Sequence, residues 1–453
     1  MIAISCCHPE RSEGSWCSPA TVDDSVMKIL YVSQYFPPEM GAPAARAAEL
    51  SRHWVNAGHE VTVLTGFPNH PTGVISPEYR AKFRRLVSRE CVDGVNVVRT
   101  FLLPFPNRNA FKRMLNYTSF CASAAATGLS TPRPDVVIAT SPQLLVALSG
   151  WWLARCKRVP FIFEVRDLWP ESLAAVGMAK ENSILHRTLA KLAKFLYAHS
   201  DRIVVVTPAF EDYLVDHWRV PRKKISVIEN GVETQLFAPE PSNGESRLRL
   251  RRELSLEGKF VASYIGTMGM AHGIETIIAA AAQLQETNPE IAFLMVGEGA
   301  EKEHVIALAR ERGLVNMRFV DQQPREKIPA YIGASDVCLV LLKKTDLFKT
   351  VIPTKMLEFM SCARPVILGV DGQAREILEE AGAGLAIEPE NSEWLVSSIR
   401  FLAANPELAA ELGRRGREHI VSKFSRAQTA ERYIRVLEHL LQLPGSPSTK
   451  VAA

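Results

Sequence analysis

Short, almost continuous apolar runs alternate with longer helical segments along most of this chain. The runs in the first half are KILYVS, VTVLT, VNVVRTF, DVVIAT, PFIFEV and RIVVVT, and those in the second are FVASYIG, IAFLMVG, MRFV, DVCLVLL and RPVILG. Apolar runs without polar alternation are typical of parallel strands that are buried on both faces. We therefore predict an α/β fold with two doubly wound halves, each a parallel sheet covered by helices.

The best linker candidate lies between the two halves, in ISVIENGVETQLFAPEPSNGE, which combines an Asn-Gly turn with a Pro/Ser/Asn/Gly-rich stretch. We expect an N-terminal domain over residues 27–222 and a C-terminal domain over 223–423, each large enough for its own core. The first clear strand follows Met27 directly, so either Met27 is the true start or residues 1–26 are a disordered extension. We favour the first interpretation, and we expect residues 446–453 to be a disordered tail.

Composition excludes several function classes. The chain has 453 residues, of which 47% are hydrophobic and 23% charged, so it is neither a disordered chain nor a polytopic membrane protein. The net charge of +4, from 53 basic and 49 acidic residues, argues against nucleic-acid binding. Eight cysteines are scattered without Cys-x-x-Cys pairs, so we expect neither a zinc site nor a disulfide framework, and a reducing cytoplasm is the simplest compartment.

One stretch suggests contact with a membrane surface. NRNAFKRMLNYTSFCASAAATGLSTP is too polar to span a bilayer, but its basic side chains could lie at lipid headgroups while its apolar ones dip below them. The basic residues are Arg108, Lys112 and Arg113, and the apolar ones are Phe111, Met114, Leu115 and Phe120. The segment YRAKFRRLVSR, with five cations and no acid, could serve the same surface or be a solvated loop. The alternative for the first stretch is an ordinary helix that covers a sheet.

Two glycine-rich turns follow predicted strands of the second half. In YIGTMGMAHGIETI, Gly266, Gly269 and Gly273 allow tight turns and a close approach of backbone to a ligand, and the helix start that follows favours an anion. VGEGAE offers Gly297 and Gly299 in the equivalent place. The spacing fits neither the dinucleotide fingerprint nor the P-loop. Each turn is therefore either a phosphate or nucleotide contact, or a plain tight turn between a strand and a helix.

Charged side chains come next along the second half. Asp321 ends another strand, where it could bond a base edge. In TVIPTKMLEFMS, Thr354 is placed to cap a helix whose Lys355 and Glu358 share a face in the first turn. A lysine there suits a diphosphate, and a glutamate suits the hydroxyls of a ribose. The alternative is an exposed Lys–Glu pair worth about 0.3 kcal/mol.

The first half offers two candidate segments. SQYFPPEMGAPAARAAEL ends a strand and places Gly41 at the mouth of a helix that carries Arg46. FEVRDLWPESL places Arg166, Asp167 and Glu171 just after a buried strand, where charges are usually kept for ligands or for one another. Because ligands of such sheets bind outside the carboxyl ends of the strands, we expect these residues to face a ligand.

With these residues assembled, the chain resembles the retaining glycosyltransferases of family 4, which have the two-domain GT-B fold. Within that family it is most similar to the WbuB-like bacterial surface-polysaccharide transferases. The segments that carry the resemblance are ILYVSQYFPPEMGAPAAR, GHEVTVLTGFPNHPTG, FEVRDLWPES, VIENGVE, VGEGAE and PTKMLEFMSCARPVI, and they cover essentially Met27 to Leu443. The resemblance implies a sugar nucleotide held mainly by the C-terminal domain, an acceptor held by the N-terminal domain, and a final helix over residues 424–445 that crosses back to the N-terminal domain.

By motif match, Glu358 would bind the ribose, Lys355 would reach the diphosphate, and the Gly41 loop would approach the phosphates or the donor sugar. The chain departs from the family pattern in two places, at the first glutamate and in the glycine-rich loop. Thr350 stands where many members carry a first glutamate, and Thr267 and His272 replace the usual Arg and Lys of the glycine-rich loop. His272 and Lys355 could then share the task of stabilising the leaving group. The predicted catalytic residues are Asp167, His272 and Lys355, and the predicted substrate contacts are Gly41, Arg46, Arg166, Gly266, Thr267, Gly297, Gly299, Asp321, Thr350, Val351, Ile352 and Glu358.

The resemblance also implies the reaction partners. The donor would be a UDP-sugar, used as a substrate with no further cofactor and no metal, and the acceptor would be a polyprenyl diphosphate-linked sugar at the inner face of a bacterial membrane. Two alternatives stay open: a GT-B-like sugar-nucleotide 2-epimerase, and a non-catalytic partner of another transferase. A nicotinamide dehydrogenase would need the glycine fingerprint that this chain lacks.

Overall fold

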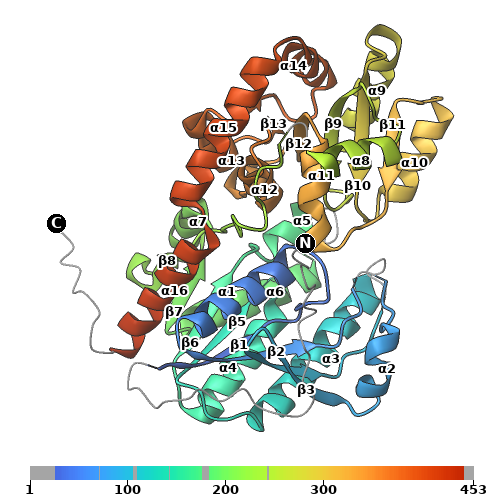
Figure 1. Ribbon diagram of the computed structural model, residues 1–453. Coiled ribbons are helices and arrows are strands. Elements are labelled where there is room, and N and C mark those ends of the chain that lie inside the picture. The colour runs from blue at the N-terminus through green and yellow to red at the C-terminus, as the bar shows by residue number, and fades with distance from the viewer. Residues whose placement is uncertain are drawn as a thin grey trace, which may run out of the picture. The chain divides into compact units, whose positions relative to one another are not determined.

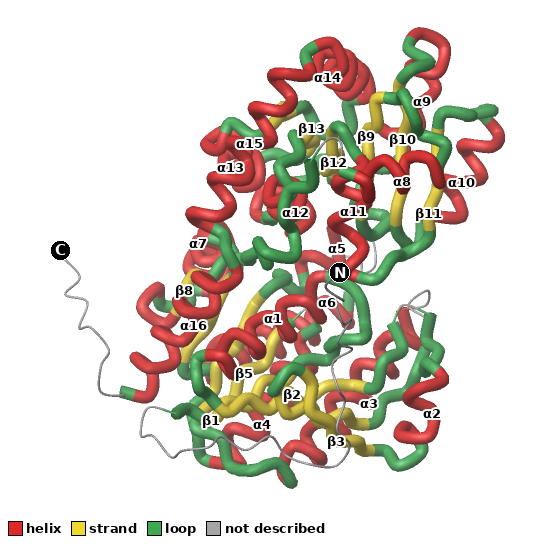
Figure 2. Tube along the Cα trace, in the orientation of Figure 1, coloured by secondary structure: helices red, strands yellow, loops and turns green. Residues whose placement is uncertain are grey.

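The computed structural model describes residues 26–70, 72–105, 110–141, 143–175, 183–241 and 244–442. The chain divides into two compact units, of which unit 1 comprises Met1–Glu229 with Thr429–Ala453, and unit 2 comprises Asn230–Gln428. Strands lie inside each unit and helices lie outside them (Figures 1 and 2). The predicted architecture of two doubly wound α/β halves is confirmed.

Unit 1 is built on an eight-stranded sheet in the order β3-β4-β2-β1-β5-β6-β7-β8, parallel except for the antiparallel pair β3–β4. Its strands are β1 (Lys28–Val32), β2 (Glu60–Gly66), β3 (Val87–Val92), β4 (Val95–Thr100), β5 (Val136–Thr140), β6 (Phe161–Val165), β7 (Arg202–Val205) and β8 (Ile225–Val227). The chain order reverses between β1 and β5, which are paired neighbours. This reversal makes the carboxyl ends of β1 and β5 the expected place for a ligand.

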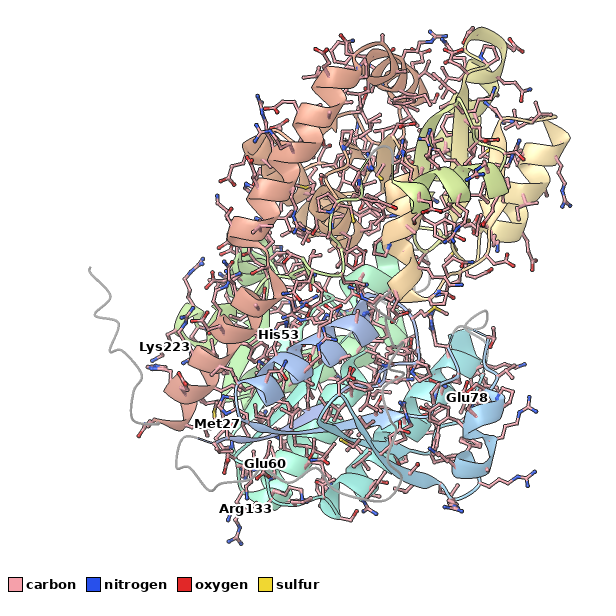
Figure 3. All side chains as sticks on the ribbon, in the orientation of Figure 1. Met27, His53, Glu60, Glu78, Arg133 and Lys223 are labelled. Atoms are coloured by element: carbon pink, nitrogen blue, oxygen red, sulfur yellow. The ribbon has the colours of Figure 1, made fainter. Side chains whose placement is uncertain are left out.

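The helices of unit 1 follow their strands. They are α1 (Ala42–Asn56), α2 (Pro77–Phe83), α3 (Ala110–Leu129), α4 (Leu144–Lys157), α5 (Glu171–Ala175), α6 (Ile184–His199), α7 (Pro208–Trp218) and the short η1 (Arg222–Lys224). Charged side chains such as Glu78, Arg133 and Lys223 are exposed on the surface of this unit (Figure 3). The last helix, α16 (Arg426–Leu441), packs Tyr433 edge-on against Trp54 of α1, with 5.1 Å between ring centroids.

Unit 2 is built on a six-stranded parallel sheet in the order β11-β10-β9-β12-β13-β14. Its strands are β9 (Phe260–Ile265), β10 (Ile291–Val296), β11 (Met317–Val320), β12 (Val337–Leu341), β13 (Val366–Gly369) and β14 (Gly384–Ala386). Its helices are α8 (Glu245–Glu253), α9 (Glu275–Thr287), α10 (Lys302–Glu311), α11 (Ile328–Ala334), α12 (Thr354–Ser361), α13 (Gln373–Ala381), α14 (Ser392–Ala404) and α15 (Pro406–Lys423), with short turns η2 (Arg325–Lys327) and η3 (Asp346–Thr350). Here the order reverses between β9 and β12.

Both faces of the unit 2 sheet are buried. Successive residues of β9 enter two different apolar clusters: Val261 and Ile265 pack with α12, α13 and α15, while Ala262 and Tyr264 pack with α9, α10 and α14. A strand whose two faces both meet helices must be apolar at every position. This explains the continuous apolar runs from which the fold was predicted.

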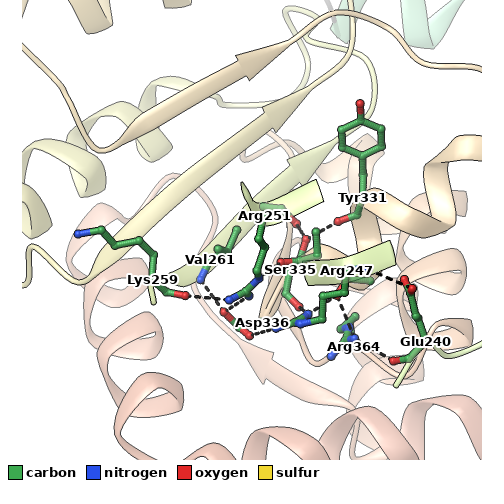
Figure 4. A network of polar contacts seen from close by, with 12 residues as sticks. Glu240, Arg247, Arg251, Lys259, Val261, Tyr331, Ser335, Asp336 and Arg364 are labelled. Atoms are coloured by element: carbon green, nitrogen blue, oxygen red, sulfur yellow. Dashed lines mark hydrogen bonds and ion pairs between the residues drawn. The ribbon is translucent and has the colours of Figure 1, made fainter. Parts of the chain in front are cut away.

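A network of hydrogen bonds and ion pairs connects α8 to the amino-terminal edge of the same sheet (Figure 4). Asp336, just before β12, accepts bonds from Arg247 and Arg251 of α8 at 2.6 Å each and from the backbone N–H of Val261 at 2.7 Å. Arg251 also donates to the carbonyls of Ala334 and Lys259. Because these groups satisfy one another, we assign the network to the fold.

The described helices include none with the length and apolar content needed to cross a bilayer. Cys121, Cys156, Cys338 and Cys362 are free. Cys91 of β3 is disulfide-bonded, which the scattered cysteine pattern did not predict. The expectations for residues 1–26 and 446–453 fall, except for residue 26, outside the described residues.

Candidate functional site

In unit 2 the candidate site lies at the carboxyl ends of β9 and β12, where the strand order reverses. The loop after β9 runs from Gly266 to Ile274, and the loop after β12 begins at Leu342. The two loops are joined by the bond from the backbone N–H of Lys343 to the carbonyl of Ala271, at 2.9 Å. The predicted glycine-rich turn thus lies at the point of the sheet where doubly wound folds bind their ligands.

Close packing of backbone explains two of the predicted glycines. A Cβ on Gly297 would lie 2.0 Å from the carbonyl oxygen of Gly266, and one on Gly299 would lie 2.2 Å from that of Met268. Both glycines also have a positive φ, of 143° and 157°. The loops after β9 and β10 therefore lie against each other, and glycine is needed here whether or not a ligand binds.

The side chain of Lys355, on α12, lies next to Gly266, the first glycine of this loop. Its Nζ is buried without a hydrogen-bond partner and lies 3.9 Å from the centre of the Tyr264 ring. A Cβ on Gly266 would be only 3.5 Å from the Cδ of Lys355. Burial lowers the pKa of Lys355 to about 7, although the Glu358 carboxylate opposes this change. A buried ammonium group that contacts only the face of an aromatic ring has no compensating charge, so an anion would bind to it favourably.

His272 belongs to the glycine loop itself. Its Nδ1 is 3.3 Å from the carbonyl of Gly269, and its ring is edge-on to Tyr264, with 6.3 Å between centroids. Burial, and then the charge of Lys355, lower the pKa of His272 to about 3. His272 is therefore neutral at pH 7 and can offer a hydrogen bond but no charge. The hydroxyl of Tyr264 donates to the carbonyl of the exposed Thr267 at 2.6 Å. Tyr264 is therefore a neighbour of Lys355, His272 and Thr267.

Glu358 does not form the surface pair with Lys355 that was the alternative to ligand binding. Instead its Oε1 accepts a bond of 2.8 Å from Arg325, whose guanidinium lies 4.9 Å from the centre of the Phe237 ring. The Glu358 side chain is 12% exposed. Sequence reasoning missed Arg325, although it follows Asp321 closely in FVDQQPREK.

The other predicted contacts of unit 2 are Asp321, Thr350, Val351 and Ile352. Asp321 is exposed and forms an ion pair with Lys302, a nearly buried lysine that was not predicted. The Thr350 hydroxyl donates to the carbonyl of Leu347 at 2.7 Å, and Val351 is half-buried. Ile352 is only 5% exposed and belongs to the apolar core, so its side chain serves packing.

In unit 1, Gly41 caps α1 with a φ of 122°, a conformation that favours glycine. Arg46 lies in the core, because its position in α1 turns it inward. Its Nη2 bonds the Oε1 of Glu164 at 2.8 Å and the carbonyl of Ile228 at 3.1 Å, and its side chain is 1% exposed. We therefore assign Arg46 to the fold and leave it out of the proposed ligand contacts.

Arg166 and Asp167 follow β6 at the carboxyl edge of the unit 1 sheet. The hydroxyl of Ser141, at the end of β5, accepts both of their backbone N–H groups, at 2.7 and 3.2 Å. Burial raises the pKa of Asp167 to about 6, and the Arg166 charge opposes this rise. The neighbouring Glu171 has a pKa that burial likewise raises. Asp167 is thus a hydrogen-bond acceptor that neutralises only in mild acid.

The expectation that the apolar side chains of residues 111–120 face a membrane is partly wrong. Phe120 is fully buried, because α3 turns this side chain towards the sheet, and Met114 and Leu115 are half-buried. Phe111 at the start of α3 is 72% exposed, and Lys112 beside it is exposed. Arg108 lies outside the described residues.

The described residues contain no group of three His, Cys, Asp or Glu side chains placed to hold a metal ion.

Two family descriptions match most of the chain. Residues 41–231 match the family described as "Glycosyl transferase 4-like domain", and residues 246–419 match "Glycosyl transferases group 1". A protein from Escherichia coli named as the colanic acid biosynthesis glycosyl transferase WcaI is 24% identical over 415 residues, which cover 88% of this chain and 98% of WcaI.

Two solved structures share the fold. Sucrose-phosphate synthase from Thermosynechococcus elongatus superposes with a TM-score of 0.72 at 21% identity, covering 91% of this chain and 99% of that one. The Anabaena protein Alr3699/HepE in complex with UDP-glucose superposes with a TM-score of 0.67 at 16% identity, covering 91% and 100%. The predicted GT-B fold is confirmed by these likenesses.

Proposed function

We propose that this chain, which has the GT-B fold and matches glycosyl transferase families over residues 41–231 and 246–419, is a retaining, metal-independent enzyme that transfers a sugar from a UDP-sugar to a lipid-linked acceptor. The sugar would be an N-acetylated hexosamine or a deoxyhexosamine, and the product would belong to a bacterial surface polysaccharide. The likeness to WcaI and the UDP-glucose bound by HepE support the pathway class and the donor.

The observation that carries the proposal is the buried, unpartnered ammonium of Lys355 below the glycine loop. A diphosphate placed over Gly266 would supply the counter-charge that Lys355 lacks. The ribose of the same nucleotide would lie farther along α12, where the Glu358 carboxylate, held by Arg325, accepts bonds from its hydroxyls. Both roles agree with those that the sequence motifs of the resemblance imply.

The proposed reaction needs little covalent chemistry from the protein. The bond between the anomeric carbon and the diphosphate breaks, the acceptor oxygen bonds the same face of that carbon, and the acceptor proton goes to the departing diphosphate. Lys355 and the backbone N–H groups of the loop would stabilise the charge that develops on the diphosphate, since groups already in place cost no reorganisation at that moment. His272 would contribute a neutral hydrogen bond, and Asp167 would orient the sugar or the acceptor.

Calorimetry and thermal shift test the donor half of this proposal. UDP, GDP, ADP and dTDP would be titrated in the presence of EDTA into the wild type, Lys355→Ala and Glu358→Ala. Lys349→Ala is the control, because this exposed lysine is paired with Asp346 nearby in the sequence. We expect UDP to bind without metal and both site variants to weaken it. Equal UDP binding by all four proteins, or none by the wild type, would remove the assignment.

Turnover separates the proposal from its two alternatives. Conversion of a UDP-sugar with no acceptor present would indicate a 2-epimerase, and UDP binding without turnover on any lipid acceptor would indicate a non-catalytic partner. Release of UDP that depends on a polyprenyl diphosphate-linked sugar would support the transferase.

We also propose peripheral attachment of unit 1 to the inner membrane surface, through the exposed Phe111 and Lys112. The support is an aromatic ring 72% exposed beside a cation; the exposed Arg84 and Arg85 of the basic segment over residues 79–89 could serve the same surface. Phe111→Ser should reduce co-sedimentation with phosphatidylcholine vesicles that contain phosphatidylglycerol. Leu129→Ser, at the other end of α3, is the control. Absence of any binding at low salt would contradict the idea.

A further inference from the structure

A pocket lies in unit 2 at the amino-terminal edge of its sheet, opposite the edge that carries the candidate nucleotide site. Its lining comes from residues at or just before the starts of β9, β10 and β12 and from the ends of α8, α9 and α14. Its volume is about 540 Å³, within the range of small-molecule sites. The six residues of β9 span roughly 20 Å between the two edges, so this pocket is separate from the nucleotide contacts proposed above.

Cations outnumber carboxylates in this pocket. The charged side chains of its lining are Arg251, Lys259, Glu290, Asp336 and Arg400. Arg247 adds a further cation, because it shares the Asp336 carboxylate with Arg251, at 2.6 Å each. This excess of positive charge favours an anionic ligand.

Arg251 and Asp336 are already used by the fold. Asp336 accepts bonds from the two arginines and from one backbone N–H, and all three guanidinium nitrogens of Arg251 donate, either to Asp336 or to backbone carbonyls. Glu290 accepts a bond of 2.9 Å from the side chain of Asn288, which also lines the pocket. An anionic ligand must therefore bind the donors that remain.

Those donors belong to Lys259 and Arg400. The Nζ of Lys259 donates to the carbonyl of Pro289 at 2.9 Å, and an ammonium group has three hydrogens to donate. Arg400 donates from Nε to the side-chain oxygen of Asn288 at 2.7 Å and from Nη2 to the hydroxyl of Thr287 at 2.5 Å. Its Nη1 has no acceptor among the residues that the structure describes. Both side chains are exposed, so these hydrogens are available to a ligand.

The two cations lie at the same turn. Arg400 bonds Asn288, and Lys259 bonds the carbonyl of the next residue. The bond from Asn288 lowers the pKa of Glu290, and the charges of Lys259 and Arg400 lower it further, so both cations are near this carboxylate. Figure 4 shows the ammonium of Lys259 pointing away from the network of α8. One anionic group can therefore contact both cations.

The rest of the lining is neutral and leaves room for more than one anionic group. It consists of Gly258, the half-buried Phe260, and Ala403 and Ala404 at the end of α14. An aromatic ring and two methyl groups form an apolar wall, which suits the C–H face of a sugar ring. Glu290 can accept a bond from a sugar hydroxyl, since a carboxylate accepts several bonds.

We infer that this pocket is a binding site for an acidic sugar, one that carries a phosphate or a carboxylate. The anionic group would lie between Lys259 and Arg400, and the ring would lie against Phe260 and the end of α14 with a hydroxyl bonded to Glu290. The inference goes beyond the proposed transferase function and does not depend on it, because none of these residues belongs to the nucleotide contacts. It gives unit 2 a second small-molecule site.

Calorimetry on the full chain tests this inference. The probes are glucose 1-phosphate, glucuronate, glucose and inorganic phosphate, each titrated with saturating UDP present to occupy the candidate nucleotide site. The site variants are Lys259→Met, Arg400→Gln and Ala404→Trp, whose indole would fill the space for the ring. The matched controls are Lys344→Met and Arg414→Gln, two exposed cations of unit 2 that form ion pairs with other residues. Lys355→Ala shows whether a probe binds at the nucleotide contacts instead. Thermal denaturation without ligand shows that each variant is folded.

We expect glucose 1-phosphate, glucuronate or both to bind the wild type, and glucose not to bind. All three site variants should weaken that binding at least fivefold, whereas the two controls and Lys355→Ala should stay within twofold. Binding of neither acidic sugar, binding that the site variants retain in full, or loss of binding in Lys355→Ala would overturn the inference. Inorganic phosphate that binds as tightly as glucose 1-phosphate would overturn the role of the ring. Failure of the proposed function would differ, since it would appear as wild type that binds no UDP.

Discussion

Replacing Lys355 with methionine should make the free protein more stable and the UDP complex weaker. Methionine keeps the unbranched shape and fills the same space without a charge. In the free protein the ammonium is buried with only the Tyr264 ring beside it. The same charge would bond the diphosphate in the complex, so the two effects have opposite signs.

The size of the stability effect follows from the pKa. Burial lowers the pKa of Lys355 from 10.5 to about 7, and each unit of pKa corresponds to about 1.4 kcal/mol. Burial of protonated Lys355 therefore lowers the free energy of unfolding at pH 7 by at most about 4 kcal/mol. Attraction of the ammonium to the Tyr264 ring offsets roughly 0.5–2 kcal/mol of this loss. We expect Lys355→Met to raise the free energy of unfolding by at most about 2–3.5 kcal/mol at pH 7.

The pH dependence has a defined sign. The unfolded chain keeps its proton up to about pH 10.5, whereas the folded one loses it near pH 7. Between these values the unfolded state binds more protons, so the wild type gains stability as the pH rises. The advantage of Lys355→Met should therefore be largest at pH 7 and below, and it should shrink towards pH 10.

The effect on binding follows from the lost charged contact. A hydrogen bond to a charged group is worth about 1.5–3 kcal/mol, so UDP should bind roughly 10- to 150-fold more weakly. Urea denaturation at two pH values measures the first effect and calorimetry the second, with the exposed Lys349→Met as control. A variant that is less stable than the wild type at pH 7, or that binds UDP equally well, would refute this reasoning.

Three further outcomes are expected. At pH 8 UDP binding should take up close to one proton, because about nine-tenths of Lys355 is neutral in the free protein and the diphosphate would favour its protonated form. Calorimetry in buffers of different ionisation enthalpy measures this uptake, and no uptake would argue against the contact between Lys355 and the diphosphate. Gly297→Ala should destabilise unit 2 by several kcal/mol, since its Cβ would overlap the Gly266 carbonyl, whereas Gly313→Ala, also with a positive φ but in open space, should cost only about 1 kcal/mol by urea denaturation. Arg46→Met should cost about 3–5 kcal/mol because Glu164 would be left buried without its partner, against less than about 1 kcal/mol for the exposed Arg414→Met; similar losses for both would contradict the assignment of a buried ion pair.

Local signals predicted the parts of this molecule that depend on a few consecutive residues. The apolar runs predicted the strands, because a strand covered on both faces needs apolar side chains at every position. The same reasoning placed the glycine-rich turns at strand ends. Lys355 and Glu358 were expected on one side of a helix start from their spacing alone.

Only the tertiary structure decided which partners the charged side chains have. Glu358 pairs with Arg325, 33 residues away, and Arg46 pairs with Glu164, 118 residues away. Phe120 turned out to be buried, while Phe111 on the same helix is exposed. The physical reason is that a charge or an apolar ring is held by whatever the fold brings next to it, and residues far apart in the sequence leave no local pattern of that contact.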